Sequence, residues 1–124
     1  MKKILLIDDE PTSLLGVVRR LKSSDYEVLT AKWGENGIDK VKSIQPDLIL
    51  LDVKMPEIDG FSALDLLKQT FTTKHIPVIM ISGYYLDDTT VEMAKSLGAE
   101  EFFEKTAEPE ELVEKVTKFL SAGH

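Results

Sequence analysis

The chain has 124 residues, enough for one domain with a single core, and its lack of cysteine excludes a disulfide framework or a thiolate metal site. Its formal net charge of -7 argues against binding of a nucleic-acid backbone by this chain, because such binding depends on clustered lysine and arginine. The apolar runs are no longer than a β-strand, which argues against a signal peptide or a membrane span. We therefore expect a soluble, cytoplasmic protein in which residues 1–124 form one domain.

Short apolar runs alternate with segments of helical periodicity along the chain. The predicted strands lie at residues 3–7, 27–31, 47–51, 76–81 and 101–103, and the predicted helices at residues 11–23, 35–44, 60–70, 87–97 and 109–121. Gly98 is typical of a helix end and Pro109 of a helix start. Five consecutive strand–helix units predict a flavodoxin-like, doubly wound α/β fold, in which a five-stranded parallel sheet of order 2-1-3-4-5 carries five helices on both faces.

Acidic residues follow two of the predicted strands. Asp8 and Asp9 come directly after the apolar run 4–7, and Asp52 comes directly after the run 48–51. The first and third strands are neighbours in the predicted order, so these carboxylates would meet at the carboxyl edge of the sheet, where open α/β sheets bind ligands. Carboxylates that meet repel one another unless a hard dication shares them, which predicts a site for Mg²⁺, or for Mn²⁺ in its place. Either cluster alone would also fit a helix cap or a turn, and only their pairing favours the metal.

Four separated stretches, each at the end of a predicted strand, form a set. They are Ile7-Asp8-Asp9-Glu10, Leu51-Asp52-Val53-Lys54-Met55-Pro56 with Asp59-Gly60, Met80-Ile81-Ser82-Gly83, and Phe102-Phe103-Glu104-Lys105. This set resembles the motifs of two-component response regulator receiver domains of the chemotaxis-regulator type, and the resemblance runs from the first strand to the last helix. It implies that Asp52 is the phosphoacceptor of a phosphorelay, which receives a phosphoryl group from a histidine kinase or a phosphotransfer protein in a Mg²⁺-dependent reaction.

The resemblance also implies a role for the polar residues around Asp52. Asp9 would ligate the metal directly and Asp8 mainly through water, while Asp52 and the backbone carbonyl of Lys54 would complete the protein ligands. A carboxylate such as Asp52 is chemically able to form an aspartyl phosphate. Lys105 would bind a phosphoryl oxygen, because attack of one anion on another requires the charge to be neutralised.

Two residues are implied as a switch. The hydroxyl of Ser82 would donate to another phosphoryl oxygen, for which Gly83 leaves room, and Phe102 would turn inward in response. This change would reshape the face formed by the fourth helix, the fifth strand and the fifth helix, and so alter the affinity for partners. The alternative is that Phe102 only packs in the core or at its edge.

The resemblance implies partners rather than a turnover substrate. A histidine kinase or phosphotransfer protein would act upstream, and a downstream protein target or an output domain would respond. A homodimer through the switching face is left open. The chain would not be an enzyme beyond its own phosphorylation and slow dephosphorylation, and it would contact neither nucleic acid nor a membrane. The cognate kinase, the stimulus and whether the domain stands alone do not follow from the sequence.

Other classes of protein fit parts of the pattern. A degenerate receiver that acts only in protein interaction is the strongest alternative, although it would be expected to lack part of the acid and lysine set. A flavodoxin-type electron carrier would bind an FMN phosphate in its first loop, which Asp8, Asp9 and Glu10 would repel. A phosphatase of the haloacid-dehalogenase type has an Asp-x-Asp pattern, and here Lys54 occupies the second acidic position.

Two departures from the resembled pattern bear on the site. Thr106 follows Lys105 where the family usually has proline, and we expect a trans peptide there because a cis bond before a non-proline residue costs about 3 kcal/mol. Lys54 lies two residues past Asp52, and Tyr84 follows the fourth predicted strand. A long cation and a bulky ring at these positions would shield an acyl phosphate from water, which predicts a longer phosphoryl lifetime than small or acidic residues would give.

Overall fold

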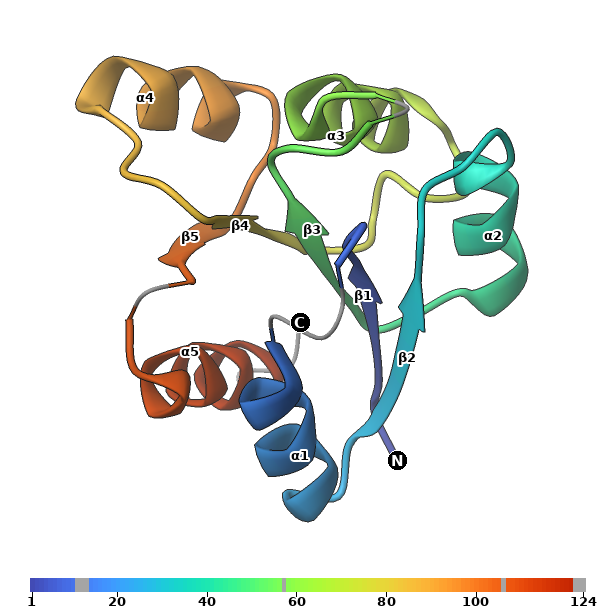
Figure 1. The fold of residues 1–124 in the computed structure, drawn as a ribbon. Helices are drawn as coiled ribbons and strands as arrows, with labels where there is room; N and C mark the ends of the chain where they lie inside the picture. The colour runs from blue at the N-terminus through green and yellow to red at the C-terminus, as the bar shows by residue number, and fades with distance from the viewer. Residues whose placement is uncertain (11–13, 57, 106, 122–124) are drawn as a thin grey trace.

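The computed structural model describes residues 1–10, 14–56, 58–105 and 107–121. Its strands are β1 (Lys3–Ile7), β2 (Glu27–Ala31), β3 (Leu48–Asp52), β4 (Val78–Ser82) and β5 (Glu101–Glu104). The helices in the described residues are α1 (Leu15–Ser23), α2 (Gly37–Ile44), α3 (Gly60–Gln69), α4 (Asp88–Ser96) and α5 (Pro109–Ser121). The strands pair in parallel in the order β2-β1-β3-β4-β5, with helices on both faces of the sheet (Figure 1). The predicted α/β fold and strand order are confirmed.

The sheet is buried between two apolar layers. Successive side chains of a strand point to opposite faces, so Leu5 and Ile7 enter the core beneath α2, α3 and α4, while Ile4 and Leu6 enter the core beneath α1 and α5 (Figure 1). Every residue of the central strands β3 and β4 is buried, as expected for parallel strands that are covered on both faces. The carboxyl ends of β3 and β4 are therefore held in position by apolar packing on both faces of the sheet.

The predicted boundaries agree with the structure to within two residues, except at the start of α1, which adjoins the undescribed residues 11–13. β4 begins at Val78 rather than at residue 76. The reason is local, because Ile76 donates its N–H to the carbonyl oxygen of Thr73 in the preceding turn and Pro77 has no N–H to donate.

The helix ends follow the signals in the sequence. Gly98 comes directly after the C-cap of α4 with a φ of 112°, and Pro109 begins α5, both as predicted. The side chain of Asp87 caps α4 by accepting a hydrogen bond from the backbone N–H of Thr90 at 2.8 Å. None of the helices in the described residues combines the length and the apolar character that crossing a membrane requires.

α3 begins directly against the end of β3. The side chain of Asp59 caps this helix by accepting a hydrogen bond from the backbone N–H of Ser62 at 2.9 Å. The N–H of Gly60 donates to the carbonyl oxygen of Val53 at 2.6 Å, and a Cβ atom on Gly60 would overlap the carbonyl oxygen of Asp52. Glycine at position 60 therefore permits the close approach that ties the start of α3 to Asp52.

Candidate functional site

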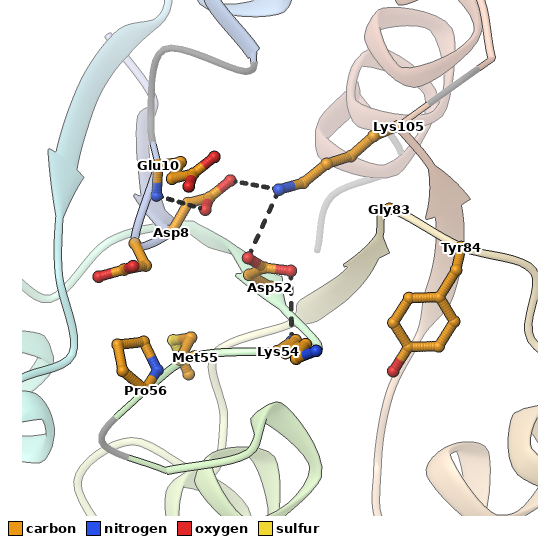
Figure 2. A pocket seen from close by; sticks show the side chains of 10 residues that line it. Asp8, Glu10, Asp52, Lys54, Met55, Pro56, Gly83, Tyr84 and Lys105 are labelled. Carbon is orange, nitrogen blue, oxygen red and sulfur yellow. Dashed lines mark hydrogen bonds and ion pairs between the residues drawn. The ribbon is translucent and has the colours of Figure 1, made fainter.

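A cavity of about 390 Å³ lies at the carboxyl edge of the sheet (Figure 2). Its lining residues come from the ends of β1, β3 and β4 and from the loop after β5: Asp8, Asp9, Glu10, Asp52, Lys54, Met55, Pro56, Gly83, Tyr84 and Lys105. The acids that the sequence placed at one sheet edge thus line a single cavity together with the predicted lysine.

Lys105 bridges two buried carboxylates in this cavity. Its Nζ lies 2.8 Å from Oδ2 of Asp8 and 3.4 Å from Oδ2 of Asp52 (Figure 2). Asp8 is 1% exposed and Asp52 is 7% exposed, so both charges are largely removed from water. A buried carboxylate is costly unless it is paired, and Lys105 provides the compensating charge for both.

The polar side chains at three strand ends accept hydrogen bonds from the backbone of the turns that follow. In each turn the backbone N–H of one residue donates to the side-chain oxygen of the residue two positions earlier. The pairs are Glu10 to Asp8 (2.9 Å), Lys54 to Asp52 (3.3 Å) and Tyr84 to Ser82 (3.1 Å). These backbone contacts were not predicted from the sequence, although an Asp or Ser that ends a strand before a turn is a recognisable signal for them.

The electrostatics of the site shift the pKa of Asp52 and of Lys105. Burial raises the pKa of Asp52 to about 6, and the hydrogen bond and negative charge of Asp8 add to the effect, while Lys105 and the N–H of Lys54 oppose it. Burial tends to lower the pKa of Lys105, but the hydrogen bond to Asp8 and the charges of Asp52 and Asp8 raise it above its ordinary value. At neutral pH the site therefore holds an ionised Asp52 next to a cationic Lys105.

The predicted metal ligands share the cavity without forming a cluster of three. Asp9 is partly buried and lines the cavity, as Asp8 and Asp52 do. Within residues 1–10, 14–56, 58–105 and 107–121, no three His, Cys, Asp or Glu side chains come together in a group that could hold a metal ion. The ammonium of Lys105 instead lies against Asp8 and Asp52. Carboxylate oxygens are nevertheless the ligands that a hard dication prefers, so the donor set fits Mg²⁺ in kind, and the metal stays a prediction.

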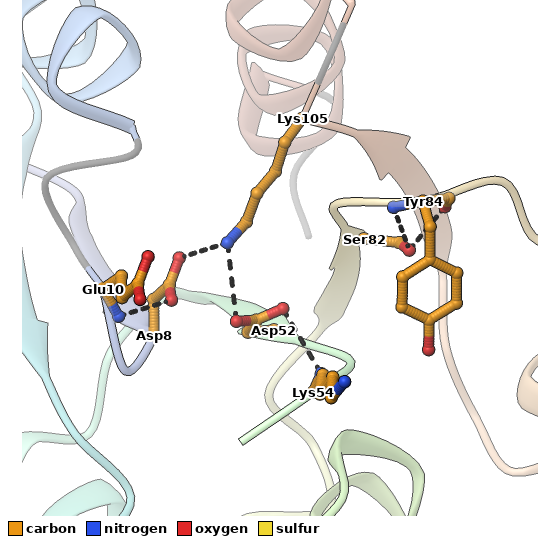
Figure 3. A network of polar contacts seen from close by, with 7 residues as sticks. All are labelled: Asp8, Glu10, Asp52, Lys54, Ser82, Tyr84 and Lys105. Atoms are coloured by element: carbon orange, nitrogen blue, oxygen red, sulfur yellow. Dashed lines mark hydrogen bonds and ion pairs between the residues drawn. The ribbon is translucent and has the colours of Figure 1, made fainter. Parts of the chain in front are cut away.

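Ser82 ends β4 but its hydroxyl is directed away from Asp52 (Figure 3). The hydroxyl donates to the carbonyl oxygen of Tyr84 at 2.6 Å and accepts from the N–H of Tyr84. Ser82 is 2% exposed and is not among the residues that line the cavity. In this state the hydroxyl is therefore not placed to donate to a group on Asp52, because a nearer donor and acceptor in its own loop satisfy it.

The remaining predicted residues take the following places. Gly83 lines the cavity, and a Cβ atom there would lie 4.0 Å from Cδ of Lys105, an ordinary contact. Phe102 is partly buried and packs against the core beneath α2, α3 and α4, so its movement stays a prediction. Thr106, where we expect a trans peptide, lies outside the described residues.

Two comparisons with known sequences cover nearly the whole chain. The family described as "Response regulator receiver domain" matches residues 4–117. Protein PilH of Pseudomonas aeruginosa is 30% identical over 121 residues, which make up 98% of this chain and 99% of PilH. The nitrate/nitrite response regulator protein NarL of Escherichia coli (strain K12) is 38% identical over 112 residues, which make up 89% of this chain and 50% of NarL. The chain thus spans nearly all of one relative and about half of the other.

Two solved structures of known proteins superpose closely on this chain. Chemotaxis protein CheY4 of Vibrio cholerae superposes with a TM-score of 0.84 at 27% identity, covering 95% of this chain and 98% of that one. A putative response regulator from Chloroflexus aurantiacus superposes with a TM-score of 0.85 at 29% identity, covering 97% and 98%.

Proposed function

Because this chain belongs to the family of response regulator receiver domains, we propose that it accepts a phosphoryl group on Asp52 from a histidine kinase or a phosphotransfer protein, in a reaction that requires Mg²⁺. The observation that carries the proposal is the setting of Asp52. Its buried carboxylate ends β3 and lines the cavity, with the ammonium of Lys105 at 3.4 Å. An anionic acceptor next to fixed positive charge is what transfer of a negatively charged group needs.

The transfer is a substitution at phosphorus. An oxygen of Asp52 bonds to phosphorus while the P–N bond of the donor's phosphohistidine breaks, and the imidazole nitrogen keeps the electron pair and takes up a proton. The product is an acyl phosphate on Asp52, and its hydrolysis returns the carboxylate and inorganic phosphate. Since the acceptor and the phosphoryl group are both anionic, the rate depends on positioning and on neutralised charge.

The cavity supplies residues for that neutralisation. Asp8, Asp9 and Asp52, together with the backbone carbonyl of Lys54, would hold Mg²⁺, or Mn²⁺ in its place, and the metal would offset the charge of the phosphoryl oxygens. Lys105 would bind a further phosphoryl oxygen. Its contact with Asp52 in the structure supports this role, because a group transferred to Asp52 would arrive within reach of the same ammonium.

Phosphorylation would act on the loop between β4 and α4. The Ser82 hydroxyl would exchange the carbonyl of Tyr84 for a phosphoryl oxygen, and Phe102 would turn inward from its partly buried position. The face formed by α4, β5 and α5 would change, and with it the affinity for a downstream target, an output domain or a second copy of the chain. The chain would act as a phosphoacceptor that catalyses only its own phosphorylation and slow dephosphorylation.

The alternative is a degenerate receiver that acts only in protein interaction. Such a protein would be expected to lose part of the acid and lysine set. The ion pairs of Lys105 with Asp8 and Asp52 favour the phosphoacceptor, because the complete set lies around one cavity.

Mass spectrometry of the intact protein after incubation with acetyl phosphate and Mg²⁺ tests the proposal. We expect the mass of one phosphoryl group to be added to the wild type and to Asp39→Asn, a control on the exposed surface of α2. We expect none on Asp52→Asn, and none on the wild type when EDTA removes the metal. An adduct that survives Asp52→Asn would show that the acceptor is another residue, and an unlabelled wild type would support the degenerate receiver.

A further inference from the structure

A second hollow lies between α3 and α4, apart from the cavity around Asp52. It has a volume of about 410 Å³ and is lined by Asp59, Phe61, Ser62, Asp65, Met93 and Leu97. We call it the α3–α4 groove. It shares no lining residue with the first cavity, and its two helices lie on the face of the sheet opposite α1 and α5 (Figure 1).

The floor of the α3–α4 groove is apolar. Phe61 and Leu97 are partly buried and pack against the core beneath α2, α3 and α4, so the groove is continuous with that core. Met93 is 44% exposed and adds a flexible thioether side chain to the wall. An apolar side chain of a partner that entered the groove would remove all three from water, which gives docking a hydrophobic driving force.

The rim of the α3–α4 groove is acidic. Asp59 and Asp65 are both exposed, and the six described residues that line the groove include no lysine, arginine or histidine. The chain as a whole carries a formal net charge of -7. A second copy of this chain is disfavoured as the occupant, because self-association through this groove would bring two acidic rims together.

We propose that the α3–α4 groove docks a protein segment that presents apolar side chains flanked by lysine or arginine. The apolar side chains would fill the space between Phe61, Met93 and Leu97, and the basic side chains would pair with Asp59 and Asp65. The basic flanks set the partner's orientation and its rate of association, while the apolar contacts supply most of the affinity. Docking in this form does not require phosphorylation of Asp52.

The probe for the test is a synthetic helical peptide of leucine and lysine at amphipathic spacing. Its control has the same length and leucine positions, with glutamate in place of lysine. Amide spectra of the full chain are recorded during titration with each peptide. We expect the leucine–lysine peptide to shift amides in the first turn of α3 and the last turn of α4, and the leucine–glutamate peptide to shift none of them.

Matched variants then separate docking from general attraction to an acidic protein. Met93→Glu should weaken binding of the leucine–lysine peptide at least about tenfold, as expected for a residue central to an interface. Asp65→Lys on the rim should weaken it less, by about fivefold, because a repulsive charge replaces an attractive one. Leu15→Glu on α1, where the wild-type side chain is 48% exposed, and Asp39→Lys on α2 should leave binding within about twofold. Thermal melts of all variants establish that they are folded.

Several results would overturn the proposal. One is that the amide shifts centre on Glu10 and Asp52 instead of the groove. Another is that the groove variants and the control variants weaken peptide binding equally. A third is that the leucine–lysine peptide does not bind at millimolar concentration. Sedimentation that shows a dimer lost in Met93→Glu but retained in Leu15→Glu would mean that a second copy occupies the groove.

Discussion

Asp52 and Ser82 end neighbouring strands, yet the structure holds their side chains in different ways. Asp52 pairs with Lys105, which follows β5, and its carbonyl lies against Gly60 at the start of α3. The hydroxyl of Ser82 exchanges hydrogen bonds with the backbone of Tyr84, two residues along the same loop. Contacts from distant segments fix Asp52 in place, whereas a change within one loop is enough to release the Ser82 hydroxyl.

The largest effect is expected for the charge of Asp52. Burial and the neighbouring Asp8 raise the pKa of Asp52 from 3.8 to about 6. Between these pH values the folded state keeps a proton that the unfolded state has released, so the free energy of unfolding falls as the pH rises from about 4 to about 6. The total loss is about 3 kcal/mol, because each pKa unit corresponds to about 1.4 kcal/mol.

Asp52→Asn should remove this loss. Urea unfolding at a series of pH values should show the variant more stable than the wild type at pH 7, by up to about 3 kcal/mol, and close to the wild type near pH 4. Asp39→Asn, on the exposed surface of α2, should keep the wild-type pH dependence. If the free energy of unfolding of Asp52→Asn and of the wild type changed with pH in the same way, the pKa of Asp52 would not be raised in the folded state.

The next largest effect is expected for Lys105→Met, which keeps the aliphatic stem and removes the charge. The initial rate of adduct formation with acetyl phosphate should fall about a hundredfold, the scale of losing one preorganised electrostatic contact. Mn²⁺, followed by paramagnetic resonance, should bind more tightly, because the ammonium no longer competes for Asp8 and Asp52. Lys115→Met is the control, since this lysine pairs only with the half-exposed Glu101 among the ion pairs described, at 3.6 Å. Weaker Mn²⁺ binding by Lys105→Met would contradict the competition.

Substitution of Gly60, which lies against the end of β3, and of Gly83, which follows β4, compares how tightly the two strand ends are packed. Gly60→Ala should destabilise the fold by about 2 kcal/mol, because the new Cβ atom would overlap the backbone of Asp52 and Val53. Gly83→Ala should change stability by less than about 0.5 kcal/mol, since its Cβ atom would meet Cδ of Lys105 at 4.0 Å. Thermal or urea unfolding measures both. Equal losses would mean that the end of β4 is as tightly packed as the end of β3.

Local patterns were enough to predict the scaffold and to place Asp8, Asp9 and Asp52 at one edge of the sheet, whereas Ser82 does not line the cavity. Apolar runs followed by Asp8 and Asp52 specify buried parallel strands with acids at their ends. The strand order then makes β1 and β3 neighbours, which brings the acids to the same edge of the sheet. The direction of the Ser82 hydroxyl was beyond such patterns. The hydroxyl donates to the carbonyl oxygen of Tyr84 in this structure and would donate to a group on Asp52 in the other state. The free energies of the two states differ by no more than about one hydrogen bond, which a sequence pattern does not resolve.

The position of Lys105 was predicted only in part. The resemblance implies that Lys105 binds a phosphoryl oxygen on Asp52, and in the structure its ammonium lies 3.4 Å from Oδ2 of Asp52. Its shorter contact is with Asp8, at 2.8 Å, and neither the sequence pattern nor the resemblance implied an ion pair between these two residues. The arrangement reflects the cost of two neighbouring buried carboxylates, a tertiary effect that appears only when β1 and β3 are paired.

The smallest effect is expected for the side chains of Lys54 and Tyr84, which line the cavity and would shield an acyl phosphate from water. The double variant Lys54→Ala, Tyr84→Ala should lose its phosphoryl group several-fold faster after acetyl phosphate is removed, as followed by intact mass. Tyr84 holds Ser82 through its backbone and not through its ring, so the substitution leaves those hydrogen bonds available and changes only the shielding. Tyr85→Ala is the control, because Tyr85 is 72% exposed and does not line the cavity. An unchanged lifetime in the double variant would show that these two side chains do not shield the acyl phosphate from water.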